Sequence, residues 1–256
     1  MKLLVKLGGT LLETAERRAS LAAQLRTLQD RGHEVVVVHG GGKRLSRYLA
    51  GLDHKSKFRR GLRVTPPEIL DAVLRVLAGS VNRQLVAGLQ KAGVQAVGLT
   101  GIDAGTVQAS QLDPELGLVG KVERVDPRLL VRLTAAGYLP TVACIAGGKG
   151  GAIYNVNADQ MAAACAAGLK VGRLVFLTDV GGVLDGDGNL IPQLSVADAM
   201  ALIGRGIAVG GMEAKLRAAS EALAAGIRHI SIVNGHQPEI LLAAAGGAAG
   251  GTELSL

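Results

Sequence analysis

Residues 3–9 read Leu-Leu-Val-Lys-Leu-Gly-Gly, and residues 35–42 read Val-Val-Val-Val-His-Gly-Gly-Gly. Each stretch is an apolar run of strand length that stops at consecutive glycines. A strand that turns into a helix at such glycines leaves backbone N–H groups at its carboxyl end, and the helix N-terminus behind them favours an anion. Two such turns in succession, with Lys6 just before the first, predict a site for polyphosphate and a second anionic ligand.

The composition is that of a globular chain with an aliphatic core. Its 256 residues are 48% hydrophobic, 19% charged and only 2% aromatic, which excludes a disordered chain. The formal net charge is +7. A nucleic-acid binder would explain this charge, but the scarcity of aromatic side chains argues against stacking on single strands. We therefore expect no nucleic-acid partner and attribute the charge to attraction of anionic small ligands or of an acidic protein.

The most basic segment is residues 54–60, His-Lys-Ser-Lys-Phe-Arg-Arg, which could bind phosphate or be a solvated loop. Cys144 and Cys165 lie in apolar surroundings without metal-ligand spacing, so we expect buried thiols in a reducing compartment. Strand-like sequence begins at Leu3, and no apolar run is long enough to span a membrane. We therefore expect a cytoplasmic protein without a signal peptide or a membrane segment.

Short β-branched runs alternate with longer helical patterns, which favours a parallel sheet covered by helices. Residues 103–125 indicate hairpins at one end of the sheet, and Thr65 is expected to cap the helix that starts at residue 66. Residues 243–251 indicate a flexible turn before a short final strand. The expected strands are 2–7, 34–38, 95–99, 139–145, 173–178 and 229–233. The expected helices are 15–31, 43–51, 66–92, 126–137, 157–169, 195–204, 211–226 and 237–246.

Residues 153–161 read Ile-Tyr-Asn-Val-Asn-Ala-Asp-Gln-Met. Asn155 and Asp159 are four residues apart, so a helix that begins at Asn155 would place both side chains on one face. There the amide could hold a polar substrate, and the carboxylate could orient a lysine. The alternative is purely structural: Asn155 or Asn157 caps the helix, and Asp159 is a favourable charge in its first turn.

Three further charged residues lie beside apolar runs or glycines. Asp179 ends an apolar run and could accept a hydrogen bond from a ribose or a base, although it could also be an ordinary exit from a strand. Lys215 follows two glycines and is expected in the first turn of a helix, where a cation is unfavourable unless an anion lies opposite. The alternative is a surface lysine whose ammonium group reaches water. Lys6, near the end of a strand, would need a partner if it is buried.

Arg63 lies between the basic segment and the prolines at 66–67, and its guanidinium offers a fork for a carboxylate unless it is an ordinary surface arginine. His39 has no second His, Cys or carboxylate at ligand spacing, so we interpret it as a structural imidazole and expect no metal site of the protein's own. The sequence contains no P-loop and no nucleophile elbow.

The order of these motifs is more specific than any one of them, and it resembles the amino acid kinase family from Leu3 to about Thr252. The resemblance implies an α/β fold, an open αβα sandwich with a mainly parallel central sheet, as a single domain over 1–256. An N-terminal lobe, about 1–170, would bind the acceptor, and a C-terminal lobe, about 171–256, would bind ATP. The motifs are Lys-x-Gly-Gly at 6–9, His-Gly-Gly-Gly at 39–42, Arg-x-Thr at 63–65, Gly-Leu-Thr-Gly-x-Asp at 98–103, Asn-x-Asn-Ala-Asp at 155–159, Leu-Thr-Asp-Val-x-Gly-Val at 177–183 and Gly-Gly-Met-x-x-Lys at 210–215.

The resemblance also implies roles for individual residues. Lys6 and Lys215 would stabilise the transferring phosphoryl group, and Asp159 would organise both lysines. Gly8 and Gly9 would offer backbone N–H groups to that phosphoryl group. The implied acceptor-binding residues are Gly40, Gly41, Gly42, Arg63 and Asn155. The implied nucleotide-binding residues are Asp179, Val180, Gly181, Gly182, Val183, Leu184, Ile207, Ala208 and Val209.

Within the family, the resemblance is strongest to members that use ATP, with Mg²⁺ carried on the nucleotide, to phosphorylate the side-chain carboxylate of N-acetyl-L-glutamate in arginine biosynthesis. The chain departs from their pattern at Lys43, Ile102 and Ala104. A second acceptor therefore stays open, namely aminoadipate or glutamate attached to a small acidic carrier protein. A catalytically inactive ligand-binding protein of the same fold is a further alternative. Because the chain begins at its first strand, the resemblance implies a homodimer without the helix that serves feedback inhibition in other members.

Overall fold

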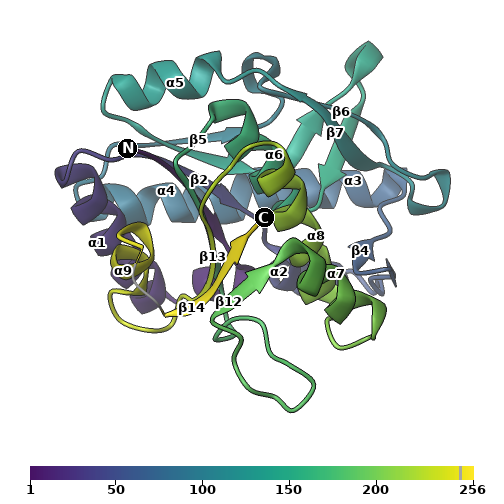
Figure 1. Cartoon of the computed structure of the whole chain (residues 1–256). Helices are drawn as coiled ribbons and strands as arrows, with labels where there is room; N and C mark the ends of the chain where they lie inside the picture. The colour runs from purple at the N-terminus through teal and green to yellow at the C-terminus, as the bar shows by residue number, and fades with distance from the viewer. Residues whose placement is uncertain (248–249) are drawn as a thin grey trace.

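The computed structural model describes residues 1–247 and 250–256 and is built around one large sheet (Figure 1). Within the described residues this sheet has eight strands, and neighbouring strands are parallel except for one antiparallel pair, β13 with β14. The mainly parallel sheet confirms the expected α/β class. In spatial order the strands are β12 (Gln193–Ser195), β14 (Gly251–Ser255), β13 (Ile230–Asn234), β11 (Arg173–Thr178), β1 (Lys2–Leu7), β2 (Glu34–His39), β8 (Leu139–Ala143) and β5 (Ala96–Thr100).

Helices pack on this sheet and on one another. Helix α6 contacts β1, β2 and β11 and packs against α8, whereas α1 contacts β2 and packs against α9 (Figure 1). The α-helices are α1 (Ala15–Asp30), α2 (Gly42–Ala50), α3 (Pro67–Val73), α4 (Asn82–Lys91), α5 (Arg128–Ala135), α6 (Ala158–Leu169), α7 (Val196–Gly204), α8 (Gly210–Ala224) and α9 (Ile240–Ala245). Short helices of other types are η1 (Gly9–Leu12), the π-helix η2 (Leu74–Val81), η3 (Asp103–Gly105), η4 (Pro114–Leu116) and η5 (Lys149–Gly151).

Strand β1 lies at the centre of the sheet, between β2 and β11, and the three strands are almost wholly buried. Parallel strands covered on both faces require such continuous apolar runs. The register pairs Leu7 with His39 on one side and with Leu177 on the other. The carboxyl ends of the three strands therefore meet at one edge of the sheet. Open α/β sheets bind their ligands outside this edge.

A second, smaller sheet contains β6 (Val107–Gln111), β7 (Val119–Val125), β9 (Ile145–Gly147) and β10 (Ile153–Val156). The antiparallel pairing of β6 with β7 confirms the hairpin that was expected within residues 103–125. The basic segment forms part of another hairpin, β3 (Phe58–Arg59) with β4 (Leu62–Arg63). This hairpin is attached to the smaller sheet, because Thr65 exchanges backbone hydrogen bonds with Leu116 at 2.9 Å and with Leu118 at 2.6 Å.

Several local expectations are wrong. Asn155 lies in β10, and α6 begins only at Ala158, with Asn157 as the cap that accepts from two backbone N–H groups. Thr65 does not cap α3, because Pro66 occupies the cap position and the threonine hydroxyl donates to Arg63 O at 3.0 Å. The expected helix over 66–92 includes the π-helix η2, and Lys215 lies in the second turn of α8. Of the turn expected at 243–251, residues 248–249 lie outside the described residues.

A buried polar network fixes the end of β2. His39 is fully buried, and its Nδ1 is 2.9 Å from Gly40 O while its Nε2 is 2.8 Å from Asn82 Nδ2. The amide of Asn82 also donates to Thr141 O in β8 at 2.9 Å. Burial lowers the pKa of His39 to about 4, so the imidazole is neutral at physiological pH. The structural interpretation of this histidine therefore agrees with its surroundings, and the network orients the glycine turn that follows.

We expect Asn82→Ala to lower the free energy of unfolding by about 2 kcal/mol, because it leaves the His39 ring nitrogen and Thr141 O buried without their donor. Urea unfolding measures the loss. The control is Gln90→Ala, at an exposed position of the same helix, which should change the value by less than ~0.5 kcal/mol. Equal effects of the two substitutions would show that the network contributes nothing specific.

Candidate active site

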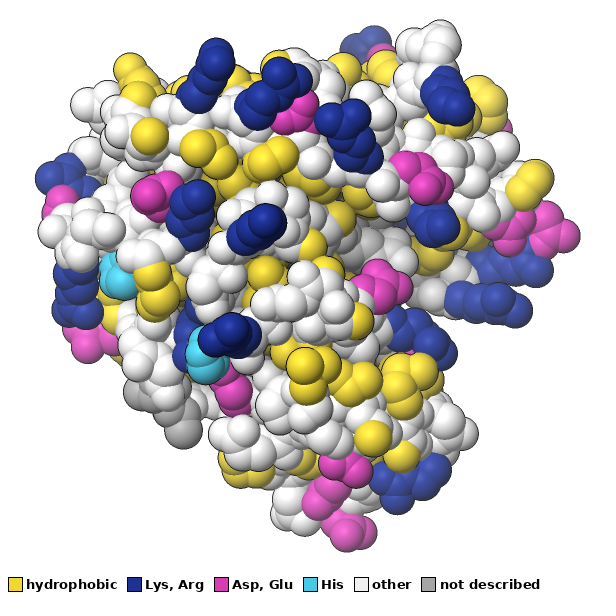
Figure 2. All heavy atoms as spheres, turned by 45° about the horizontal axis from the view of Figure 1, so that its top comes forward, with side chains coloured by type: hydrophobic (Ala, Val, Ile, Leu, Met, Phe, Trp, Pro, Cys, Tyr) yellow, Lys and Arg dark blue, Asp and Glu magenta, His cyan; other side chains and the backbone are white. Residues whose placement is uncertain are grey.

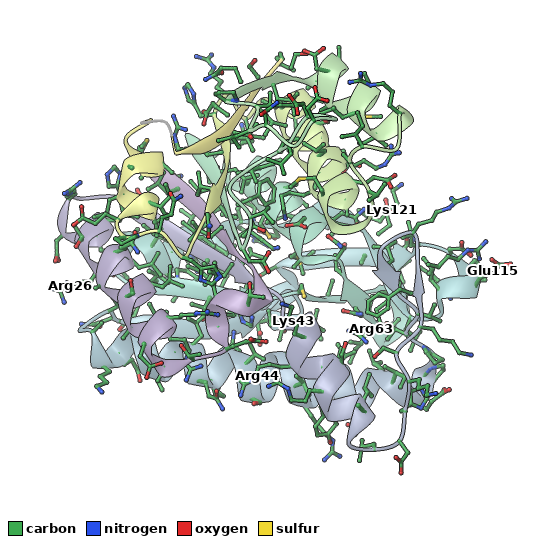
Figure 3. The ribbon with its side chains drawn as sticks, turned by 90° about the horizontal axis from the view of Figure 1, so that it is seen from below. Arg26, Lys43, Arg44, Arg63, Glu115 and Lys121 are labelled. Carbon is green, nitrogen blue, oxygen red and sulfur yellow. The ribbon has the colours of Figure 1, made fainter. Side chains whose placement is uncertain are left out.

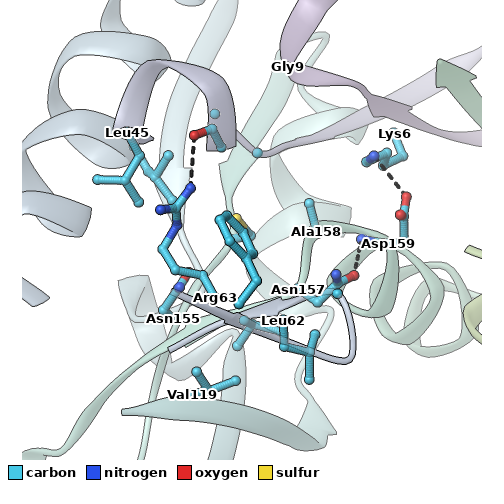
Figure 4. Close-up of a pocket in the computed structure, with 18 of the residues that line it drawn as sticks. Lys6, Gly9, Leu45, Leu62, Arg63, Val119, Asn155, Asn157, Ala158 and Asp159 are labelled. Carbon is cyan, nitrogen blue, oxygen red and sulfur yellow. Dashed lines mark hydrogen bonds and ion pairs between the residues drawn. The ribbon is translucent and has the colours of Figure 1, made fainter. Parts of the chain in front are cut away.

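Two buried lysines share one buried carboxylate at the carboxyl edge of the large sheet. Asp159 Oδ1 lies 2.8 Å from Lys6 Nζ (Figure 4). The same oxygen lies 3.0 Å from Lys215 Nζ, and Asp159 Oδ2 lies 3.1 Å from that ammonium group. Only 8%, 7% and 5% of Lys6, Asp159 and Lys215 are exposed. The three residues come from β1, α6 and α8, so the structure brings together three residues that are far apart in the sequence.

Burial and charge act against each other on these groups. Burial raises the pKa of Asp159, but the two ammonium groups outweigh it and hold the pKa below the usual range, so the carboxylate is ionised at neutral pH. Burial and the nearby charge of Lys6 together lower the pKa of Lys215 to about 8, against the opposing effect of Asp159, which raises it. Lys215 also lies over the ring of Phe176, with Nζ 5.3 Å from the centroid. The cluster therefore carries a surplus positive charge that an anion could neutralise.

The glycine turns form one wall of a cavity beside this cluster. Gly9 and residues 40–42 line the cavity together with Lys6 and Asp159. A Cβ at Gly41 would lie 2.6 Å from Leu77 Cδ2 of the π-helix, so this close approach of the backbone favours glycine. The N–H of Gly8 donates to Leu177 O at 2.9 Å and so serves the fold. The expectation that Gly8 offers its N–H to a ligand is therefore wrong for this conformation.

Arg63 and Asn155 line the opposite part of the same cavity. The guanidinium of Arg63 donates to Gly42 O at 3.0 Å, to Ser46 Oγ at 2.8 Å and to Ser56 Oγ, and it lies over the ring of Phe58. Figure 4 shows this side chain held between α2 and the β4 strand that carries it. Because its position is fixed before any ligand binds, the guanidinium can present its remaining N–H groups to a carboxylate.

Sequence reasoning did not find the residues that hold these two side chains. Asn155 Nδ2 donates to the hydroxyl of Thr65 at 3.0 Å, so the threonine that resembled a helix cap orients the amide instead. Ser46 and Ser56 were not singled out, since single serines in a helix and a loop carry no recognisable signal. Their role depends on the fold, which brings α2 and the basic segment to the same guanidinium.

The residues expected to border a nucleotide lie in two segments of the second half of the chain. The chain just beyond the first segment lies beside the second, because a Cβ at Gly186 would be 3.5 Å from Ile207 Cδ1. Val180, Leu184 and Val209 are exposed and offer apolar surface. Val183 and Ala208 are buried, so they could reach a ligand only through their backbone. The remaining predicted residues are Asp179, which is half exposed, Gly181, which has open space around it, and Gly182, which packs against Leu190 and Thr252.

The rest of the described chain adds three observations. In residues 1–247 and 250–256 we find no group of three His, Cys, Asp or Glu side chains placed to hold a metal ion. The same residues include no helix long and apolar enough to cross a membrane. Both cysteines are buried and free, and burial raises the pKa of the Cys144 thiol, which lines the cavity, to about 12. This thiol is therefore a poor nucleophile.

Comparison with known proteins identifies the family. Residues 1–234 match the amino acid kinase family. The chain belongs to this family. An acetylglutamate kinase of Solibacter usitatus (strain Ellin6076) is 56% identical over 241 residues, which cover 94% of each chain. An acetylglutamate kinase of Acidobacterium capsulatum is 43% identical over 243 residues, again 94% of each chain. Membership of a kinase family implies the use of ATP, in agreement with the surplus positive charge of the cluster.

Solved structures confirm the amino acid kinase fold. A protein from Streptococcus mutans UA159 has a TM-score of 0.86 at 26% identity and covers 99% of this chain and 98% of its own. N-acetylglutamate synthase from Neisseria gonorrhoeae, solved with coenzyme A and N-acetyl-glutamate, has a TM-score of 0.88 at 26% identity. It covers all of this chain, which corresponds to 59% of the synthase chain.

We expect Asp159→Asn to lower the free energy of unfolding by about 3 kcal/mol, because it leaves two buried ammonium groups facing each other without a counter-charge. Adding Lys215→Met should restore at least half of that loss by removing one of the two charges. The measurement is chemical unfolding at pH 7.

The matched control adds Lys91→Met to Asp159→Asn, because Lys91 is an exposed lysine at the end of α4 and its removal changes the net charge equally. It should restore nothing. If both second substitutions restore stability alike, net charge rather than contact within the cluster explains the effect.

Proposed function

We propose that this chain catalyses the ATP-dependent phosphorylation of the side-chain carboxylate of N-acetyl-L-glutamate, a step of arginine biosynthesis. The observation that carries the proposal is the Lys6–Asp159–Lys215 cluster, whose Lys6 and Asp159 line the same cavity as Arg63 and Asn155. The acetylglutamate kinases that match nearly the whole chain support this choice of acceptor.

The reaction needs positive charge and positioning more than proton transfer. A carboxylate oxygen of the acceptor attacks the γ-phosphorus, the new P–O bond forms, and the bond to the bridging oxygen breaks, so that ADP leaves with the bonding electron pair. An acyl phosphate and ADP are the products. The acceptor is already ionised at neutral pH, so no general base is required. Lys6 and Lys215 would neutralise charge on the transferring phosphoryl group, and Asp159 would hold both ammonium groups in place.

The two substrates would approach from different halves of the chain. Arg63 would bind a carboxylate of the acceptor and Asn155 its acyl-amino end, while residues 40–42 border the same cavity. ATP would lie over the segments 179–184 and 207–209, where exposed apolar side chains could cover the adenine. Mg²⁺ would enter as part of the MgATP substrate, since this ion is commonly bound through substrate phosphates. Gly9 is the glycine of the first turn that faces the cavity.

The assembly and the location remain proposals. We propose a homodimer that works in the cytoplasm, where ATP is available and the two buried thiols stay reduced.

On the face drawn in Figure 2, Lys and Arg side chains are spread among apolar and acidic ones. That arrangement supports a general attraction of anionic substrates.

The test measures MgATP-dependent ADP release with four acceptors: N-acetyl-L-glutamate, L-glutamate, L-aspartate and UMP. We expect turnover with N-acetyl-L-glutamate and at least about 100-fold lower kcat/KM with the other three, because only this acceptor combines the carboxylate with an acyl-amino group. Asp159→Asn with Lys215→Met is the inactive control. Turnover with glutamate or aminoadipate on an acidic carrier protein, without turnover of free N-acetyl-L-glutamate, would show that the acceptor is carrier-linked. The proposed phosphorylation of a carboxylate would then still hold. No turnover with any acceptor would contradict the proposal.

The pKa of Lys215 predicts an alkaline limit to activity. Because burial lowers this pKa to about 8, the ammonium loses its proton as the pH rises through that value, and kcat/KM for MgATP should fall by up to about tenfold per pH unit above it. The fall should not reflect unfolding. The pKa of Lys215 is lower in the folded chain than the usual lysine value of 10.5, so the free energy of unfolding rises as the pH increases from about 8 to 10.5.

Lys215→Arg provides the control, since arginine keeps its charge over this pH range. The activity of this variant should be lower, but it should be nearly independent of pH between ~8 and ~9.5, because the pKa of arginine lies well above this range. A flat profile for the unaltered chain over the same range would show that Lys215 does not need its proton for activity.

A further inference from the structure

Lys43 has no role in the mechanism above, although it lies beside the site. It is in the first turn of α2, directly after the glycine turn of residues 40–42, and its Nζ is 3.8 Å from Asp179 Oδ2. The two side chains are 62% and 45% exposed. An ion pair as open as this one adds little to stability, because water and salt screen it. Folding alone therefore does not explain why a lysine occupies this position.

The strand order determines where this contact lies. Lys43 follows β2 and Asp179 follows β11, and β1 lies between these strands. The turn after β1 is close to the turn before α2, since a Cβ at Gly9 would lie 3.7 Å from Gly42 N. A lysine that reaches from α2 to the end of β11 must therefore cross the edge at which β1 ends, where Lys6 faces the cavity. Figure 3 shows Lys43 near the centre of this face of the molecule.

The charges around the Lys43 ammonium group favour a partner with more negative charge than the single carboxylate of Asp179. The first turn of α2 contains Lys43 and Arg44 and no acidic residue, and a cation at the positive end of a helix is unfavourable unless an anion lies opposite. Arg44 is directed to another partner, since its Nη1 donates to Gln84 Oε1 at 2.7 Å. The separation of 3.8 Å between Lys43 and Asp179 exceeds a hydrogen bond. A single carboxylate thus satisfies this ammonium group only in part.

We infer that Lys43 is a third phosphate-binding lysine, which contacts the phosphate chain of the nucleotide from the acceptor half of the chain. Asp179 holds its ammonium group over the site until the nucleotide binds, and the phosphate oxygens then take the place of the carboxylate. Lys6 and Lys215 contact the same anion from below, so the phosphate chain is bound by residues of both halves. The inference rests on the proposed function, because it requires a nucleoside triphosphate as a ligand.

The test is isothermal titration of MgATP into the purified full chain and into two variants. Lys43→Met should raise the Kd about tenfold and make it less dependent on salt concentration, because it removes one charge-assisted contact with phosphate. Arg44→Met is the matched control, with the same change of charge one residue further along α2, and it should change the Kd by less than about twofold. The thermal unfolding temperature should change little in either variant, since Lys43 is exposed and the half-buried Arg44 makes only a solvent-exposed hydrogen bond.

Each outcome decides the inference. Equal affinity of Lys43→Met and the unaltered chain would overturn it, and so would equal losses in the two variants, which would indicate only the general field of the surface. Lys43→Arg should restore part of the affinity. If the unaltered chain binds MgATP and transfers its phosphoryl group to the acceptor while Lys43→Met behaves alike, only the role of Lys43 is rejected. If the unaltered chain does not bind MgATP, both the inference and the proposed function are rejected.

Discussion

The sharing of one buried carboxylate by two buried ammonium groups is the interaction on which the site depends. Lys6 and Lys215 would be too costly to bury alone, and Asp159 compensates for only one of the two charges. The parallel register of β1, the capped start of α6 and the packing of α8 on α6 all serve to bring these groups together. In the proposed reaction, the positive charge that remains would attract the phosphoryl group before transfer and stabilise it during transfer.

The backbone around this cluster is held by packing rather than by charge. Leu77 of the π-helix lies against Gly41, and the neutral ring of His39 lies between Gly40 O and the amide of Asn82. A π-helical segment widens one turn of an otherwise regular helix and often occurs near functional sites. Here it supplies the apolar surface that the glycine turn rests on. A change in this packing would displace the backbone of residues 40–42, which lines the cavity, without touching any charged residue.

The sequence predicted those parts of the molecule that depend on local patterns. The buried strands and the turns after β1 and β2 follow from apolar runs that stop at glycines, and the small second sheet was expected only in its β6–β7 hairpin. Thr65 illustrates the limit. Two prolines and a glutamate after it resemble a helix start, yet its hydroxyl orients Asn155, 90 residues further along the chain. Such a contact depends on the register of distant strands, which no local pattern encodes. For Lys215, the local pattern left a surface lysine as an alternative, and only the order of motifs along the chain indicated its contact with Asp159.

The cavity also discriminates between kinds of acceptor. An alcohol must lose its proton to attack phosphorus, whereas a carboxylate has lost it already. Among the described residues that line the cavity, Asp159 is the carboxylate closest to the lysines, and both its oxygens are engaged by ammonium groups that keep its pKa low. The Cys144 thiol is protonated, since burial raises its pKa to about 12. The cavity therefore offers cations and hydrogen-bond donors but only weak proton acceptors. Such surroundings favour a nucleophile that arrives ionised, and Arg63 in the same cavity could bind a carboxylate of the proposed acceptor. Recognition and reactivity would then favour the same kind of functional group.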